Sequence, residues 1–242
     1  MELTPDIKEV ARYLGYHGIV PDDNIREQIE QCIRDLQEAA VPRFVYERFP
    51  LSIRTEPEKA PLLCFESVEI RSRDLAKNLG DCTGVYLMAV TLGPGPDRLI
   101  ARAAVREMSK AVLYQAAAAA MTETWCDSVN ERIRLEAERE GLFTRPRYSP
   151  GYGDLPLGLQ REISRILNMP KEIGVSLTGA LLMTPSKSVT ALIGVSDKPG
   201  ECGSRGCEDC SASGNCPYRA VETQGELPQG DELIQGSYSE KV

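Results

Sequence analysis

The sequence predicts an α+β fold in which an antiparallel or mixed sheet packs against long helices. Two strand-like runs, 173–183 and 188–196, are joined by Thr184-Pro185-Ser186-Lys187, a turn composition that favours an antiparallel hairpin. A strand-helix-strand pattern occupies 62–92. A long helix is expected over 109–140, because apolar residues recur there every four positions. These residues are Leu113, Ala117, Met121, Trp125, Val129 and Ile133.

The remaining elements follow from local signals. Thr4 is expected to cap a short helix that runs to Leu14. Asp22 and its neighbours open an amphipathic helix that Pro42 ends. The other expected elements are strand pieces within 41–53, one strand over 62–70, a helix over 73–79 between Ser72 and Gly80, a strand over 85–92, and a helix over 157–167 that ends at Asn168 and Pro170.

The bulk properties are those of a globular protein. The chain has 242 residues, 42% hydrophobic and 26% charged, enough for one large domain or a domain with an appendage. Its net charge of -8 argues against a nucleic-acid partner. No apolar run approaches the roughly 20 residues of a membrane helix, and the first residues lack the basic and apolar parts of a signal peptide. We therefore expect a cytoplasmic protein with no membrane partner.

The glycine-proline run 93–97 precedes the helical centre at 97–140. A dinucleotide fingerprint requires free backbone N–H groups near its glycines, and Pro94 and Pro96 have none. A rigid turn followed by a helix that Asp97 caps is the favoured interpretation. Farther along the helical region, Glu123 lies at the edge of the apolar stripe. On the residues alone, a solvated surface carboxylate is favoured over a ligand-binding group.

The run Arg147-Tyr148-Ser149-Pro150-Gly151-Tyr152-Gly153-Asp154 is too rich in proline and glycine for a helix or an ordinary strand. Two tyrosines and an arginine in one stiff loop are suited to stacking and to binding a carboxylate. A binding site and a tight linker before the next helix both remain open on this chemistry.

The eight cysteines form two groups. Cys32, Cys64, Cys82 and Cys126 are scattered among apolar neighbours and are expected to be core residues. The other four, close together in a sequence expected to be cytoplasmic, indicate metal or redox chemistry. Three close cysteines plus one followed by Pro217 favour an iron–sulfur cluster; structural zinc and a redox or unliganded thiol set are the alternatives. This second group is Cys202, Cys207, Cys210 and Cys216.

The composition divides the chain into three parts. Residues 1–198 are expected to form the main α+β domain. Residues 199–221 form a small cysteine-rich C-terminal lobe that binds a metal or cluster. Residues 222–242 lack core-forming side chains and are expected to be a flexible tail.

Four blocks of sequence, taken in order, resemble the activation (reactivation) domain of vitamin B12-dependent methionine synthase, including stand-alone versions of that domain. The resemblance runs from about 97 to 196, is weak in the N-terminal third and does not include the cysteine cluster. The blocks are Asn130-Glu131-Arg132-Ile133-Arg134, Arg147-Tyr148-Ser149-Pro150-Gly151-Tyr152, Ile173-Gly174-Val175-Ser176-Leu177-Thr178 and Met183-Thr184-Pro185-Ser186-Lys187-Ser188-Val189.

The resemblance implies a ligand and a site. Domains of this family bind S-adenosylmethionine (AdoMet) in a shallow groove and present it to a cobalamin that has been oxidised to Co(II), while a partner supplies an electron. Arg147 matches the arginine that holds the AdoMet carboxylate, and Glu123 matches a glutamate that meets the positive end of the ligand. Tyr152 matches the tyrosine of the same loop. The implied AdoMet-binding set is Glu123, Arg147, Tyr148, Ser149, Gly151 and Tyr152, with the backbone at Tyr148 and Ser149 facing the adenine.

The departures from the family are also informative. The full-length enzyme uses an acidic residue at the start of its domain, for which Asp22, Asp23 and Glu47 are only weak candidates here. The cobalamin signature Asp-x-His-x-x-Gly is missing, and His17 is the single histidine. The chain is therefore part of a methionine synthase system rather than a complete enzyme, and it meets cobalamin only through a partner protein.

Three functions are compatible with these features. The first is an AdoMet-binding accessory protein that reactivates a methionine synthase lacking its own activation domain; its partners are that corrinoid protein and an electron donor, and the cysteines relay the electron. The second is an iron–sulfur reductive activator of another corrinoid methyltransferase. The third is a zinc-stabilised regulatory or interaction module.

Overall fold

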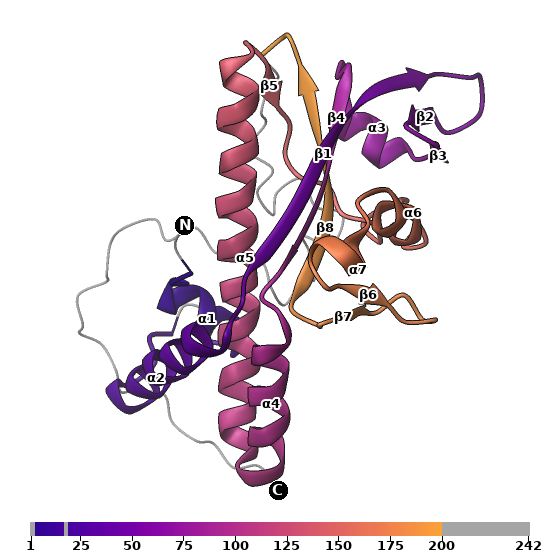
Figure 1. Cartoon of the computed structure of the whole chain (residues 1–242). Helices are drawn as coiled ribbons and strands as arrows, with labels where there is room; N and C mark the ends of the chain where they lie inside the picture. Colours follow the sequence, from indigo (N-terminus) through magenta and orange to yellow (C-terminus); the bar gives the residue numbers. More distant parts are fainter. Residues whose placement is uncertain (1–2, 17–18, 200–242) are drawn as a thin grey trace, which may run out of the picture. The chain divides into compact units, whose positions relative to one another are not determined.

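The computed structural model describes residues 3–16 and 19–199, which lie within one compact unit. A six-stranded sheet, ordered β3-β2-β1-β4-β8-β5 and antiparallel throughout, carries helices on both faces (Figure 1). The predicted α+β class is confirmed. The strands of the sheet are β1 (Arg43–Arg54), β2 (Leu62–Phe65), β3 (Val68–Arg71), β4 (Gly84–Thr91), β5 (Phe143–Thr144) and β8 (Ser188–Ser196).

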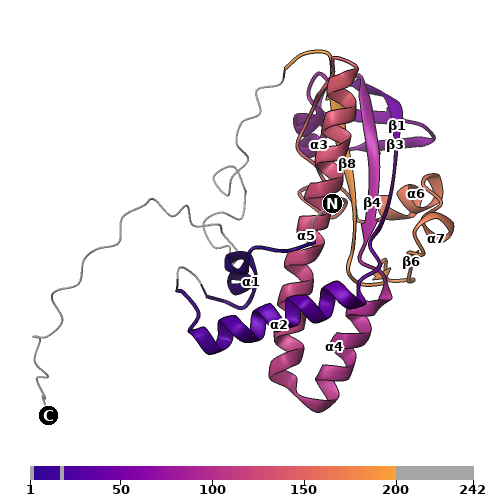
Figure 2. The same ribbon diagram turned by 60° about the vertical axis from the view of Figure 1, so that its left-hand side comes forward.

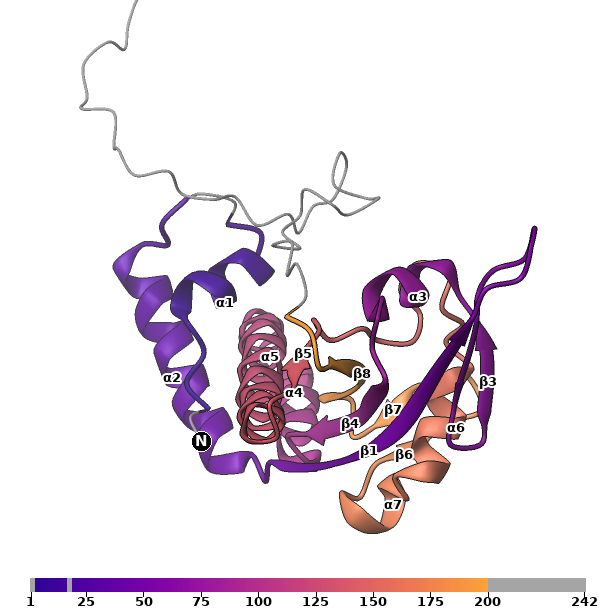
Figure 3. The ribbon, with the colours of Figure 1, turned by 90° about the horizontal axis from the view of Figure 1, so that it is seen from above.

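One face of the sheet is covered by α5 (Met108–Arg139), the predicted long helix. The next layer, beyond α5, holds α1 (Ile7–Tyr13) and α2 (Asp23–Ala39), as the view from above shows (Figure 3). A further helix, α4 (Pro94–Arg106), runs beside the first half of α5 (Figure 2). The apolar stripe predicted for α5 is buried, which explains why so long a helix is stable on the sheet.

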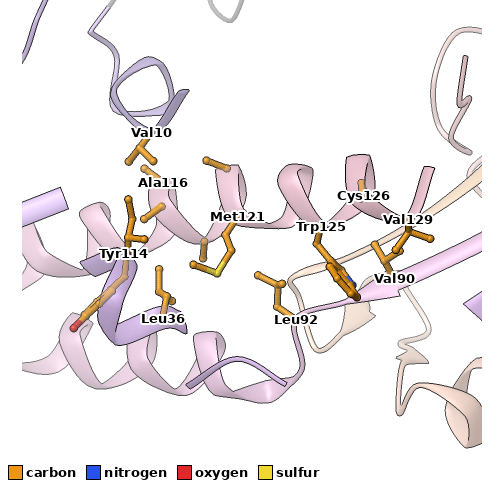
Figure 4. Packing of buried hydrophobic residues seen from close by; sticks show 14 of the residues in the cluster. Val10, Leu36, Val90, Leu92, Tyr114, Ala116, Met121, Trp125, Cys126 and Val129 are labelled. Carbon is orange, nitrogen blue, oxygen red and sulfur yellow. The ribbon is translucent and has the colours of Figure 1, made fainter. Parts of the chain in front are cut away.

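The buried residues of α5 include a small one next to α1 and a large one next to the sheet. Val10 of α1 lies against Ala116, whereas Trp125 points toward Val90 of β4 (Figure 4). The indole N–H of Trp125 donates to the Arg43 carbonyl at 3.1 Å, so this buried polar group is satisfied. The alanines at 116–118 and 120 are buried, and their small side chains allow close packing on this part of α5.

The opposite face carries α3 (Arg73–Leu79), α6 (Leu159–Ile166), α7 (Met169–Glu172) and a separate hairpin of β6 (Ser176–Leu177) and β7 (Met183–Thr184). The predicted boundaries of α3 are confirmed: the Ser72 side chain accepts from the Leu75 N–H, and the helix ends at Gly80 with φ 47°.

Several predicted elements are wrong in detail. The run 62–70 is two strands, because Glu66 adopts φ 46° and turns the chain. The expected hairpin between 173–183 and 188–196 does not form; the first run folds on itself around Leu181 (φ 66°), and β8 pairs with β4 and β5. Pro170 lies in the first turn of α7 rather than ending α6.

Two predicted helix caps are also wrong. Asp6, not Thr4, caps α1 by accepting from the Lys8 N–H. Asp97 lies inside the first turn of α4 and accepts from the Ser186 N–H at 2.7 Å, so it ties α4 to the segment before β8.

The glycine-proline run serves packing between helices. Pro94 starts α4 at a position where its missing N–H costs nothing. A Cβ on Gly95 would lie 1.9 Å from the Ala39 carbonyl oxygen, so this glycine allows α4 to approach the end of α2. Gly95 and Pro96 are buried in that contact. The expected rigid turn is therefore wrong: residues 94–97 form the first turn of α4, and the run serves helix packing.

The scattered cysteines are core residues, as predicted, except that Cys64 is half-buried. Burial raises the pKa of Cys32 and Cys82 to about 11 and that of Cys126 to about 12, so these thiols stay protonated. The four clustered cysteines and the boundaries at 199–221 and 222–242 concern residues outside those described, apart from 199, and stay predictions. No described helix is long and apolar enough to span a bilayer.

Candidate ligand-binding site

A groove lies where the strand pairing of β8 ends. On one side β8 pairs with β4 along its length; on the other, β5 pairs only with Val195 and Ser196, and Tyr148 bridges to Leu192. Toward the start of β8, no further strand pairs with this edge in the part of the chain that the structure describes. The groove there has a volume of about 370 Å³. It is lined by Glu123, Arg147, Tyr148, Ser149, Pro150, Tyr152, Gln160, Met183, Ser188, Val189 and Thr190.

The loop 147–154 is held in place by its own main chain. The Tyr148 N–H and C=O each pair with Leu192 at 2.8 Å, which makes the loop an extension of the sheet. The Gly151 N–H donates to the Leu155 carbonyl at 2.9 Å, in a turn where Gly151 has φ 92°. Tyr152 remains 67% exposed above this turn. The result is a shaped rim with an accessible aromatic ring.

Asp154 anchors the far end of the loop to α3. Its carboxylate accepts from the Ser72 hydroxyl, from the Arg73 N–H at 2.7 Å and from the Asp74 N–H at 3.2 Å. In return, the Asp154 N–H donates to the Asp74 carboxylate at 3.1 Å. Burial acts to raise the pKa of Asp154, but these hydrogen bonds outweigh it and the pKa is lowered. Asp154 thus satisfies helix N–H groups that the first turn of α3 leaves unpaired.

One end of the groove is charged. The Arg147 guanidinium contacts Glu123 at 2.8 Å and also forms an ion pair with Asp127. The two carboxylates lie four residues apart on α5, so they share one helix face. Burial acts to lower the pKa of Arg147, but the hydrogen bond to Asp127 and the neighbouring charges raise it overall. Arg147 is therefore a permanent cation whose two partners are 48% and 67% exposed.

The other end of the groove is neutral and polar. Gln160 of α6 is 7% exposed and Thr190 of β8 is 2% exposed. The Ser188 hydroxyl, also buried, donates to Thr91 Oγ1 or to the Pro185 carbonyl, at 2.8 and 2.7 Å. Because side chains alternate along a strand, Ser188 and Thr190 share with Leu192 the face on which α6 packs. The groove therefore wraps around the edge of β8, from α5 on one face to α6 on the other.

The structure brings together most of the site residues named from the sequence. Glu123, Arg147, Tyr148, Ser149 and Tyr152 line the groove. Gly151 does not line it and instead forms the turn beneath Tyr152, against Leu157.

Some details of the implied site differ in the structure. The main-chain N–H and C=O of Tyr148 are both hydrogen-bonded to Leu192, so this N–H is not available as a donor to a ligand in the groove. The acidic candidates Asp22, Asp23 and Glu47 lie outside the groove lining, and Asp22 caps α2.

Three groove or rim residues, Asp127, Gln160 and Thr190, lie outside both the predicted site and the four family blocks. The spacing of Asp127, four residues after Glu123 on a predicted helix, was a usable signal. Gln160 and Thr190 gave none, because only the packing of α6 over the edge of β8 makes them neighbours of the groove. Among residues 3–16 and 19–199, no cluster of three or more histidines, cysteines or acidic residues has a metal-binding arrangement.

The fold and groove define an α+β domain with a groove at an open sheet edge. Residues 74–201, slightly more than half of the chain, match the family described as "Vitamin B12 dependent methionine synthase, activation domain". The chain belongs to this family. The matched region ends one residue before Cys202, so the four clustered cysteines lie beyond it.

A solved structure shows the same fold. The chain is similar to the protein in "Crystal Structure of the MetH Reactivation Domain bound to AdoHcy", with a TM-score of 0.51 and 18% sequence identity. The similarity covers 74% of this chain and 69% of that one. Among curated proteins, none matches this chain.

Proposed function

We propose that residues 1–198 bind AdoMet in the groove and act as the activation module of a separate cobalamin-dependent methionine synthase. The observation that carries this proposal is the charged end of the groove, where Arg147 and Glu123 meet. The similar MetH reactivation domain, which was solved with AdoHcy, supports a ligand of this class. The family supports a cobalamin protein as the partner.

The charges suit the methionine half of AdoMet. This half carries a carboxylate, an ammonium and a sulfonium, a net charge of +1. The groove offers one cation, Arg147, and two carboxylates, Glu123 and Asp127, a net charge of −1. Opposite charges at short range hold such a zwitterionic end in one orientation.

Without ligand, Arg147 is already paired, so binding requires an exchange of partners. Asp127 is the more exposed carboxylate, and an exposed ion pair is worth only about 0–1 kcal/mol. We infer that the ligand carboxylate replaces Asp127 on the guanidinium, while Glu123 keeps its contact and turns its other oxygen toward the ligand's positive end. Tyr152 covers the ligand from the rim, and the backbone of Ser149 and Pro150 lies beside it. Bound in this way, AdoMet would supply a methyl group to the cobalamin of the partner once a donor had reduced Co(II) to Co(I), and S-adenosylhomocysteine would be left in the groove.

The cysteine segment has a separate place in the proposal. Spacing alone supports a cluster or metal at Cys202, Cys207, Cys210 and Cys216, and an electron relay there suits a module that works with a partner donor. Absorption spectra and metal analysis of anaerobically purified protein distinguish the forms. Iron with sulfide and visible absorbance supports the relay; a colourless protein with stoichiometric zinc rejects it and leaves AdoMet binding untouched.

Calorimetry with AdoMet tests the groove. Removing a charged hydrogen-bonding partner costs about 1.5–3 kcal/mol, so Arg147→Ala is expected to weaken binding by roughly 10- to 100-fold. Arg134→Ala is a matched control, because Arg134, like Arg147, pairs with two carboxylates of α5, here Glu131 and Glu138. Equal losses in both variants, or no heat with the native protein, would reject the assignment.

A further inference from the structure

The neutral end of the groove contains two buried polar atoms without a hydrogen-bond partner. Gln160 Oε1 and Thr190 Oγ1 have none within the described part of the chain. Both residues are more than nine-tenths buried, and both line the groove. A buried polar atom that stays unpaired destabilises the folded protein, so such groups in native structures call for an explanation. A ligand bound in the groove would provide the missing hydrogen-bond partners and so explain these two atoms.

The main chain of β8 adds to this unpaired surface. On the outer side of the strand, the Gly194 carbonyl accepts from Arg145, and Leu192 exchanges hydrogen bonds with Tyr148. Main-chain groups of a strand point alternately to its two sides, so the N–H and C=O of Thr190 face the same open edge. Thr190 therefore presents both its hydroxyl and its main chain at the point where the sheet ends and the groove begins.

We propose that Gln160 and Thr190 bind the adenosyl half of the ligand. This inference rests on the proposed function, and it names the recognition residues of the end opposite Arg147. The adenosyl half is uncharged and rich in hydrogen-bonding groups. Its amino and ribose hydroxyl groups are the donors that the Gln160 oxygen lacks, and the Thr190 hydroxyl is able to donate or accept. The charged residues of the groove gather at the other end, so the two ends match the two halves of AdoMet.

The test compares AdoMet with 5′-methylthioadenosine, which keeps the adenosyl half and lacks the amino-acid half. Gln160→Met and Thr190→Val remove the polar atoms with little change in volume. Each variant is expected to weaken binding of both probes by about tenfold, whereas Arg147→Ala weakens binding of AdoMet alone. Thr190→Ser keeps the hydroxyl and is expected to keep the affinity.

Thermal stability provides a readout that a structural role would not give. Because each substitution removes an unpaired buried group, the Tm of Gln160→Met and Thr190→Val is expected to stay equal or rise while affinity falls. Asn78→Leu is the matched control. Asn78 is 3% exposed, its side-chain amide nitrogen and oxygen are both unpaired, and it lies outside the groove lining. Its replacement is expected to leave both affinities unchanged.

The outcomes separate this inference from the proposed function. If the native protein binds AdoMet and Arg147→Ala weakens it, the function stands. The inference is then overturned if Gln160→Met and Thr190→Val leave both affinities intact, or if they weaken AdoMet without affecting methylthioadenosine. If the native protein binds neither probe, both are rejected. Loss of affinity together with a lower Tm in both variants also rejects a recognition role.

Discussion

Replacing Asp154 tests whether the binding loop depends on α3 for its position. Its carboxylate accepts three hydrogen bonds from Ser72, Arg73 and Asp74, two of them from main-chain N–H groups at the start of the helix. Asp154→Ala removes all three acceptor contacts and keeps the hydrogen bond from the Asp154 N–H to Asp74. We expect a small loss of stability and a looser ligand-binding rim.

The magnitude follows from helix capping. Loss of a capping side chain costs about 0.5–2 kcal/mol, and the exposed position of Asp154 favours the lower half of that range because water replaces part of the contact. For a chain of this size, about 0.5–1 kcal/mol lowers Tm by roughly 1–4 °C. In the variant, ligand binding must also order the loosened loop. If this costs the same free energy, AdoMet binding weakens by about two- to fivefold. That is less than the loss expected for Arg147→Ala.

The pH dependence gives the sharper check. The pKa of Asp154 is lowered in the folded protein, so its contribution is present above the unfolded pKa and is lost as pH falls through the folded value. The native protein should therefore have a higher Tm than Asp154→Asn at pH 7, and this difference in Tm should disappear in acid. Glu27→Ala, at an exposed position of α2, serves as the control. A Tm difference that does not shrink as the pH falls through the acid range, or the absence of a difference at pH 7, would refute the reasoning.

Two further predictions concern packing and thiol chemistry. Gly95→Ala places a methyl group against the Ala39 carbonyl oxygen. It should lower the free energy of unfolding, measured by heat or urea, by about 1–3 kcal/mol or more. Gly158→Ala, whose Cβ would meet nothing within 4 Å, should be nearly neutral, and equal effects would contradict the contact. Alkylation at pH 8 with peptide mapping should label Cys64 before Cys32, Cys82 and Cys126, whose raised pKa values leave about a thousandth or less as thiolate. Labelling of Cys126 as fast in native protein as in urea would contradict its burial.

The parts of the fold that were predicted are those set by local chemistry. Ser72 and Gly80 bound α3 because a hydroxyl cap and a left-handed residue act within one helical turn. The α5 stripe repeats over many turns, so its burial was readable without knowing its partners. The missed hairpin shows the limit of such signals. The strand-like composition of 173–183 does not reveal that Leu181 turns the run onto itself, or that β8 finds its partner in β4.

The candidate site was predictable to the same degree. Arg147 and Tyr152 were found because a stiff loop with recognition side chains is visible in the sequence and matches a family block. Glu123 was included only through that resemblance, since its position on the stripe edge favoured a solvated carboxylate; the structure places it in the groove lining. Gln160 and Thr190 are set by tertiary packing alone: α6 must lie over the edge of β8 before either one faces the groove.

The position of the groove follows from the way the sheet ends. β5 pairs with only two residues of β8, and the loop after it adds a single bridge at Tyr148 before turning away at Pro150. An exposed strand edge invites pairing with another chain, and proteins usually cover or charge such edges. Here Arg147 and the exposed Tyr152 flank the open segment, which leaves room for a small molecule rather than for another strand. The open edge thus supplies polar main-chain groups, α5 supplies the charges and α6 closes the neutral end.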